Sequence, residues 1–171
     1  MSGPTTKRSS LHPKSLSPET KSSVGTFLEH FYKISDKQEC NQEWAKQFDG
    51  EATLVMGSDV AKGLDDIQAL RQGMWEKVST RTHKVQKVFI GGVEGDEYDT
   101  VHKESEECEV VILGDVRYSL RNTEKEETSG GEWSARGKLK MVDEPGKWKW
   151  VYYRVFLTGD LVELDGQKKS C

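Results

Sequence analysis

Cysteine is scarce in this sequence, and the few present form no pattern. Cys40, Cys108 and Cys171 make no CxxC pair, and none lies at metal-ligand spacing from the four histidines. We therefore expect no metal site and a reducing compartment, with the cytoplasm as the location. Long apolar runs are also absent from the sequence, so neither a secretory signal nor a membrane-spanning segment is predicted, and no membrane partner is expected.

Excess positive charge is missing as well. The 25 Lys and Arg residues are balanced by 29 Asp and Glu residues, for a formal net charge of -4, and the two signs are intermixed. Because a phosphate backbone requires a basic stripe, no nucleic-acid partner is expected. The motifs HExxH, GxxxxGKS/T and GxSxG do not occur, so the sequence gives no support for a zinc hydrolase, a phosphate-binding loop or a nucleophile elbow.

The chain is long enough for one domain and has polar ends. A sequence of 171 residues can bury about two thirds of its unfolded surface in a single core. Residues 1–17 are rich in Ser, Thr, Pro and Lys and are predicted to be disordered. Residues 18–158 are predicted to form the domain, and residues 159–171 a flexible C-terminal tail.

Helices are predicted in the first half of the chain. Ser17 as N-cap and Pro18 at the first position start a helix. Its apolar stripe follows at helical spacing as Val24, Phe27, Leu28, Phe31 and Tyr32. A short second helix is predicted over residues 39–48, a strand over residues 51–57, and a third amphipathic helix over residues 64–78.

The second half is predicted to consist of strands. Four runs rich in β-branched and aromatic residues span 82–90, 108–122, 131–142 and 147–157, with a charged loop at 123–131 and a DEPG turn between the later ones. Strict alternation in the last run places Trp148, Trp150, Tyr152, Arg154 and Phe156 on one face. Gly114 suggests a bulge in the second run. Helices early and strands late favour an α+β fold with a curved antiparallel sheet.

The order of these elements and several landmarks are similar to those of a known family. The landmarks are a Tyr late in the first helix (FYKISD), a second short helix ending in Phe before EATLVMG, a Gly-Leu-Asp-Asp-Ile helix start, RTHKV opening the next strand, and a final DEPGKWKW turn and strand. With these landmarks, residues 20–158 resemble the nuclear transport factor 2-like superfamily, in its SnoaL-like (polyketide cyclase-like) branch. The resemblance implies a cone-shaped fold in which a curved antiparallel sheet wraps about three helices. It also implies an apolar interior that binds a small molecule, and a homodimer formed through the sheet.

The resemblance carries over to individual residues only in part. Tyr32 matches the helix-borne Tyr of ketosteroid isomerase and a water-binding Tyr of scytalone dehydratase, and His83 resembles one of the two pocket histidines of the dehydratase. Met56 stands where the isomerase has its general base, and Lys138 stands near the position of its oxyanion-hole acid. Asp115 lies in the neighbourhood of the dehydratase's second histidine. Neither mechanism therefore transfers whole.

Three residues are candidates for acid–base chemistry. A neutral His83 could accept a proton from a substrate while Tyr32 donates to the developing oxyanion. Each has a plainer interpretation, since His83 can instead meet solvent at the strand entrance and Tyr32 can be a core residue with its hydroxyl at the rim. Asp115 interrupts an apolar strand beside Arg117. One interpretation is that Asp115 is buried and has a shifted pKa, so that it can act as an acid or a base. The other is that it forms a salt bridge on the outward surface of the sheet.

A set of aromatic residues and one Met could line the substrate pocket. The set is Trp44, Met56, Trp75, Tyr118, Trp133, Trp150 and Tyr152, and most of its members are expected to be ordinary core. Arg154 lies among aromatic residues on the last strand, where an unpaired charge would be costly. It is a candidate to bind a carboxylate or enolate of the ligand, or alternatively a carboxylate of the protein or of a dimer partner.

We therefore predict an enzyme of secondary metabolism that needs no cofactor. It would be an isomerase, a cyclase or a dehydratase (a lyase) that acts by acid–base chemistry on an apolar polycyclic or polyketide-derived small molecule in an enclosed pocket. The alternative is a noncatalytic small-molecule-binding or dimerisation module of the same fold. A third interpretation, an adaptor that binds a protein through the open sheet face, requires Tyr153, Val155 and Leu157 to be exposed.

Overall fold

The computed structural model describes residues 15–93, 107–121, 128–143 and 146–157. In these ranges the elements are α1 (Pro18–Ser35), the 3₁₀ turn η1 (Gln38–Cys40), α2 (Asn41–Ala45), β1 (Phe48–Met56), β2 (Asp59–Lys62), α3 (Gly63–Lys77), β3 (Val78–Gly92), β4 (Glu107–Leu120), β5 (Thr128–Met141) and β6 (Trp148–Leu157). None of the described helices is both long and apolar enough to cross a membrane. Most of the two predicted tails, and parts of the predicted loop and DEPG turn, fall outside the described residues.

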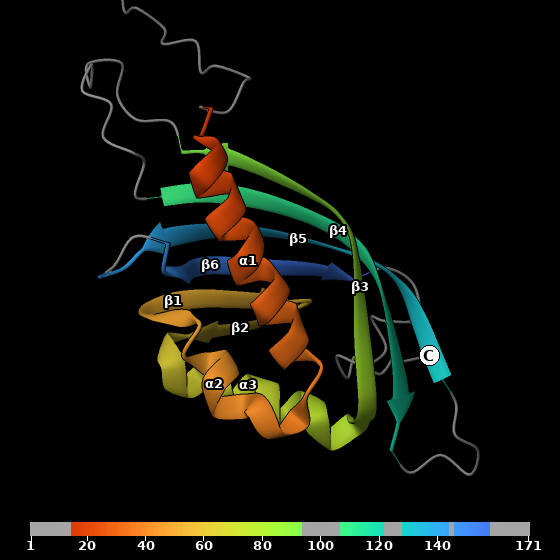
Figure 1. The fold of residues 1–171 in the computed structure, drawn as a ribbon. Helices are drawn as coiled ribbons and strands as arrows, with labels where there is room; N and C mark the ends of the chain where they lie inside the picture. Colours follow the sequence, from red (N-terminus) through yellow and green to blue (C-terminus); the bar gives the residue numbers. More distant parts are fainter. Residues whose placement is uncertain (1–14, 94–106, 122–127, 144–145, 158–171) are drawn as a thin grey trace, which may run out of the picture.

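The six strands form one curved sheet in the order β2-β1-β6-β5-β4-β3. Figure 1 shows α1 crossing one face of this sheet, with α2 and α3 near the end formed by β1 and β2. The predicted α+β cone with three helices is confirmed. The sheet is mixed, however, because β6 returns beside β1 in parallel while the other neighbours pair antiparallel. The predicted antiparallel pairing therefore holds for every neighbouring pair of described strands except β1 and β6.

Helix α1 starts as its sequence predicts. The Ser17 side chain accepts a hydrogen bond from the backbone N–H of Thr20 at 3.1 Å, and Pro18 occupies the first position. The predicted stripe is buried from Val24 to Tyr32. Because this stripe packs against the sheet, α1 fixes the position of its own C-terminal end, where the polar residues of the cavity gather.

The C-terminal end of α1 is held by a buried arginine from α3. Arg71 is 1% exposed and donates to backbone carbonyls and one amide oxygen, those of Ile34, Ser35, Lys37 and Asn41. Its guanidinium also lies over the rings of Trp44 and Trp75. Free carbonyls at a helix end need donors, and Arg71 supplies them. Burial is the main cause that lowers its pKa, to about 9, so the side chain stays cationic at neutral pH.

A bulge in β6 overturns the predicted alternation of the last strand. Lys138 pairs with Tyr152 and the next residue, Leu139, pairs with Trp150, so Val151 is an extra residue. Trp148 and Trp150 face the core, but after the bulge the inward side chains are Tyr153, Val155 and Leu157. These three cannot form the exposed surface that the adaptor interpretation requires.

Gly114 does not form the predicted bulge. The register shift lies on β3, at Gln86, and the inward–outward alternation of β4 continues unchanged through Gly114. A glycine is needed there for another reason. A Cβ at this position would lie 2.5 Å from the carbonyl oxygen of Lys84 and 3.2 Å from the ring of Trp133. The missing side chain therefore lets two strands and an indole approach closely.

Candidate active site

The cone encloses a cavity of about 610 Å³. Its walls come from the C-terminal end of α1, from α2, α3 and β2, and from the inward faces of the other strands. Six of the predicted site residues line it: Tyr32, Trp44, Met56, His83, Tyr118 and Trp133. The volume and the aromatic walls are typical of a small-molecule site.

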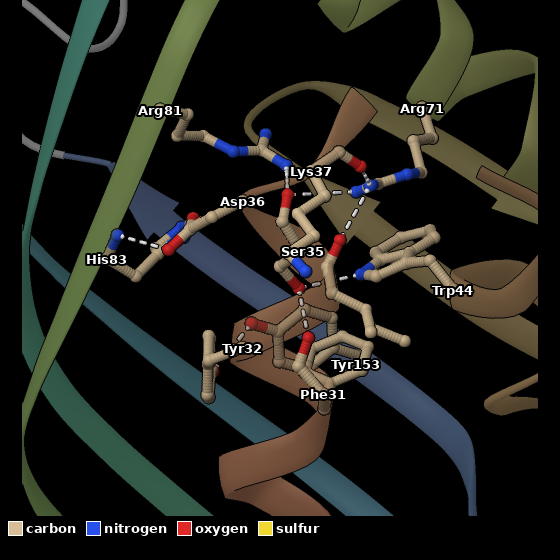
Figure 2. Close-up of polar contacts among 11 residues, drawn as sticks. Phe31, Tyr32, Ser35, Asp36, Lys37, Trp44, Arg71, Arg81, His83 and Tyr153 are labelled. Carbon is tan, nitrogen blue, oxygen red and sulfur yellow. Dashed lines mark hydrogen bonds and ion pairs between the residues drawn. The ribbon is translucent and has the colours of Figure 1, made fainter. Parts of the chain in front are cut away.

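His83 is held in one orientation by Asp36. The ring Nδ1 lies 2.5 Å from Oδ1 of Asp36, and the backbone N–H of His83 donates to the other carboxylate oxygen at 2.9 Å. Asp36 is the C-cap residue of α1, and His83 lies on β3. Figure 2 shows the two side chains reaching toward each other across the gap between helix and strand. Their side chains are 16% and 22% exposed for His83 and Asp36.

This arrangement leaves the second ring nitrogen of His83 free to act as a base. Burial is the largest effect on the pKa of His83 and lowers it, whereas the hydrogen bond to Asp36 opposes this. The ring is therefore neutral at pH 7. The carboxylate of Asp36 accepts a hydrogen bond from Nδ1–H, so Nε2 bears a lone pair. A histidine oriented by a carboxylate in this way is suited to general-base chemistry.

Two phenols form a donor pair next to His83. The hydroxyls of Tyr32 and Tyr153 lie 2.9 Å apart, and the rings of Tyr32 and His83 are 5.5 Å apart between centroids. Burial is the main cause that raises the pKa of both phenols, so both stay protonated. One hydroxyl donates to the other, and the accepting hydroxyl keeps its own proton for a further acceptor. The pair can therefore donate to an oxygen of a bound molecule.

Trp133 completes an aromatic wall around His83. Its ring centroid lies 5.4 Å from that of His83 and 5.3 Å from that of Tyr32. The indole Nε1 is buried and has no hydrogen-bond acceptor among the described residues. Buried donors are normally satisfied, so the missing acceptor of this N–H is unusual.

Arg81 lies on the same face of β3 as His83, two residues earlier. It lines the cavity, donates to the backbone carbonyl of Ser35 at 2.5 Å, and its guanidinium lies 4.8 Å from the ring centroid of Trp75. Burial lowers its pKa to about 10 and the charge of Asp36 partly offsets this, so Arg81 is a cation at neutral pH. Figure 2 shows Arg81 approaching the end of α1 from β3.

Asp36, Arg81 and Tyr153 were missed in the sequence. Alternation along β3 contained the signal for Arg81, because it places this residue on the face of His83. Asp36 follows the end of a helix, where a carboxylate normally meets solvent, and nothing local indicates its partner. Tyr153 was missed because strict alternation placed Tyr152 on the core face. The bulge in β6 instead turns Tyr153 inward and Tyr152 outward.

Two predicted charged residues lie outside the cavity. Asp115 is on the outward face of β4, where its carboxylate accepts a hydrogen bond from the side chain of Gln86. This is the outward position that the plainer interpretation anticipated. Arg154 is exposed on the outward face of β6, with its guanidinium 4.8 Å from the ring centroid of Phe156. The geometry gives neither residue access to a molecule in the cavity.

Three predicted aromatic residues also do not line the cavity. Trp75 and Trp150 are buried in the core, where Trp150 packs against Phe27 and Phe31 of α1. Tyr152 is only partly buried and faces outward after the bulge. Among the described residues, no group of three His, Cys, Asp or Glu side chains is arranged to hold a metal ion.

Comparison with known proteins places the fold. No protein-family model matches the sequence, and neither does any curated protein. A candidate scytalone dehydratase from Novosphingobium aromaticivorans is similar in structure, with a TM-score of 0.65 at 14% identity over 81% of this chain and 84% of that one. Hexachlorocyclohexane dehydrochlorinase LinA type 2 gives 0.64 at 12% identity over 84% and 90%. Nuclear transport factor 2 from Cryptosporidium parvum gives 0.62 at 13% identity over 85% and 99%. The chain therefore has the nuclear transport factor 2-like fold that its sequence resembles.

Proposed function

We propose that this chain is an enzyme without a cofactor, in which Asp36 and His83 remove a proton from a small apolar molecule held in the cavity. The observation that carries the proposal is the double contact of Asp36 with His83, which fixes the ring and leaves Nε2 directed away from the carboxylate. The aromatic lining supports a polycyclic or polyketide-derived substrate.

The reaction needs only the groups already described. Nε2 of His83 takes a proton from a substrate carbon, and Asp36 stabilises the imidazolium that forms. The electron pair of the broken C–H bond forms a C=C bond, and a leaving group on the neighbouring carbon departs with its own electrons. The hydroxyl pair of Tyr32 and Tyr153 donates the proton that a departing or developing oxyanion requires. Return of the proton to another carbon would give isomerisation or ring closure in place of elimination. A dehydratase and a dehydrochlorinase among the similar structures support elimination.

The test uses the purified protein in deuterium oxide with a panel of aromatic and polycyclic β-hydroxy ketones and β-hydroxy acids, and with an extract of the source cells. Mass spectrometry follows loss of water and uptake of deuterium. We expect Asp36→Asn and His83→Gln to lower the rate by about 10²–10⁴-fold. Asp115→Asn removes the same charge on the outward face and is expected to retain the wild-type rate.

Two results would count against the enzyme. Equal rates in wild type and Asp36→Asn would separate the activity from the proposed base. Retention of a compound by the wild type with no conversion would instead favour the noncatalytic binding module.

We also propose that a second copy of this chain binds the outward face of the sheet. Four apolar side chains are exposed there on β3, β4 and β6: Phe89, Val111, Leu113 and Phe156. An ion pair of Arg136 and Glu109 lies on the same face, so the patch carries both signs of charge and can complement itself across a two-fold axis. In sedimentation velocity we expect a dimer that Phe89→Glu dissociates. A wild-type monomer at the highest concentrations would contradict this.

A further inference from the structure

The cavity region holds two arginines whose hydrogen bonding differs. Arg71 uses both Nη groups on backbone carbonyls at and just after the end of α1 and its Nε on the side-chain oxygen of Asn41 in α2, so its donors are directed at protein acceptors. Arg81 lines the cavity, and within the described ranges its guanidinium gives one hydrogen bond, to the carbonyl oxygen of Ser35, although a guanidinium carries five N–H groups. The Nε of Arg81 is buried without an acceptor in the described structure. Capping of α1 is already done by Arg71, and it does not account for the free donors of Arg81.

The charges around the cavity also indicate that the protein itself does not satisfy Arg81. Within the described part of the chain, neither guanidinium forms an ion pair with a carboxylate. Asp36 is the acidic group beside them, and both of its oxygens are occupied by His83. The interior therefore holds two cations and one anion. The carboxylates of Asp59, Asp66 and Glu76, by contrast, belong to exposed residues of the cavity lining and are screened by solvent.

A second unsatisfied donor lies on the other side of His83. The buried Nε1 of Trp133 lacks an acceptor among the described residues, and its ring is 5.4 Å from that of His83. The indole N–H groups of Trp75 and Trp150 are also buried without an acceptor among the described residues, but only Arg81 and Trp133 line the cavity. An unpaired buried donor is costly, and a ligand in the cavity that supplied oxygen atoms to these two residues would remove that cost. Arginine forms its strongest hydrogen bonds with planar, charged acceptors such as a carboxylate.

We infer that the substrate is an organic acid whose carboxylate binds Arg81, while the indole N–H of Trp133 donates to an oxygen of the same molecule. This inference rests on the proposed function, because it places the reacting carbon at His83. Residues two apart on a strand lie about 6.6 Å apart, so a carboxylate on Arg81 brings a C–H group one or two bonds away toward Nε2 of His83. Arg81 is thus the residue that selects acids over neutral compounds of the same shape.

The test compares matched pairs of acid and neutral amide: benzoate with benzamide, cinnamate with cinnamamide, and 1-naphthoate with 1-naphthamide. Binding to the full-length protein is measured by isothermal titration calorimetry at neutral pH. At least one acid is expected to bind tenfold or more tightly than its amide. In Arg81→Gln, which keeps a side-chain donor for the carbonyl of Ser35, the preference is expected to fall to about one. Arg81→Lys, which keeps the charge but lacks the planar fork, is expected to lie between them.

Further variants separate this inference from the proposed function. His83→Gln is expected to bind the acids as well as the wild type does. Acid binding by a wild-type protein that converts nothing in the substrate panel would sink the proposed enzyme and leave the acid site standing. A panel in which no acid binds more tightly than its amide, including one in which nothing binds, overturns the inference. An unchanged preference in Arg81→Gln, with circular dichroism showing a folded protein, overturns it too.

Discussion

The neutral state of His83 can be tested on the protein alone, without a substrate. Burial lowers the pKa of this histidine and Asp36 raises it, with burial the larger effect. The unfolded chain therefore binds a proton at this residue at a higher pH than the folded chain does. Removing His83 as His83→Gln should expose this difference as a change in the pH dependence of stability.

The sign and size of the effect follow from proton linkage. Above the unfolded pKa of about 6.5, neither state is protonated at His83 and its contribution to stability is fully present. As the pH falls below that value, the unfolded chain takes up a proton first, so the free energy of unfolding decreases until the pH falls through the folded pKa. One proton limits the slope to about 1.4 kcal/mol per pH unit.

The assay is urea unfolding of wild type and His83→Gln in steps from about pH 8 down to about pH 5. Groups that titrate in both proteins largely cancel in the difference between them. We expect the wild type to lose free energy of unfolding relative to the variant as the pH falls. The opposite slope would mean that Asp36 dominates and that folded His83 is an imidazolium. That result would refute the assignment of His83 as a general base at neutral pH.

Three further predictions concern stability and are checked by urea unfolding. Tyr153→Phe removes a buried hydroxyl hydrogen bond and is expected to cost about 1–2 kcal/mol, whereas Tyr152→Phe on the outward face should change the free energy of unfolding by less than about 0.5 kcal/mol. Gly137→Ala places a Cβ against the buried indole ring of Trp150 and is expected to lower the free energy of unfolding by about 1–3 kcal/mol. As a control, the new Cβ in Gly25→Ala has no neighbouring atom within 4 Å, and this change inside α1 is expected to raise the free energy of unfolding by about 0.5–1 kcal/mol. Arg71→Met leaves the end of α1 without its donors and is expected to cost about 3–5 kcal/mol; a loss below 1 kcal/mol would contradict the capping role.

Local sequence signals predicted the elements of the fold well. Ser17 and Pro18 mark the start of α1, because capping and a fixed proline φ act within a few residues. Strand β2 was missed between the predicted strand at 51–57 and the predicted helix at 64–78, because its four residues are too few for a periodic pattern. The second helix proved shorter than predicted, since β1 already begins at Phe48.

The sequence indicated a site residue only where that residue could be recognised without knowledge of its partners in space. Tyr32 and His83 were located by the resemblance to the nuclear transport factor 2-like superfamily, with helical spacing as additional support for Tyr32. The contact between Asp36 and His83 joins residues far apart in the chain, and the spacing of a sequence contains no trace of such a pair. The facing of Tyr153 depends on one inserted residue in β6, and a bulge of that kind changes no local composition.

Different elements of the fold carry the proposed acid–base residues and part of the apolar lining of the cavity, so the two can be altered separately by mutation. The groups that we propose to move protons are anchored on α1, β3 and β6, whereas Val60, Leu70 and Met74 belong to β2 and α3 and carry no titratable group. Substitutions at these three positions would alter the size and shape of the compounds admitted while the acid–base residues keep their supports. Laboratory evolution toward a new reactant can therefore begin at these three sites.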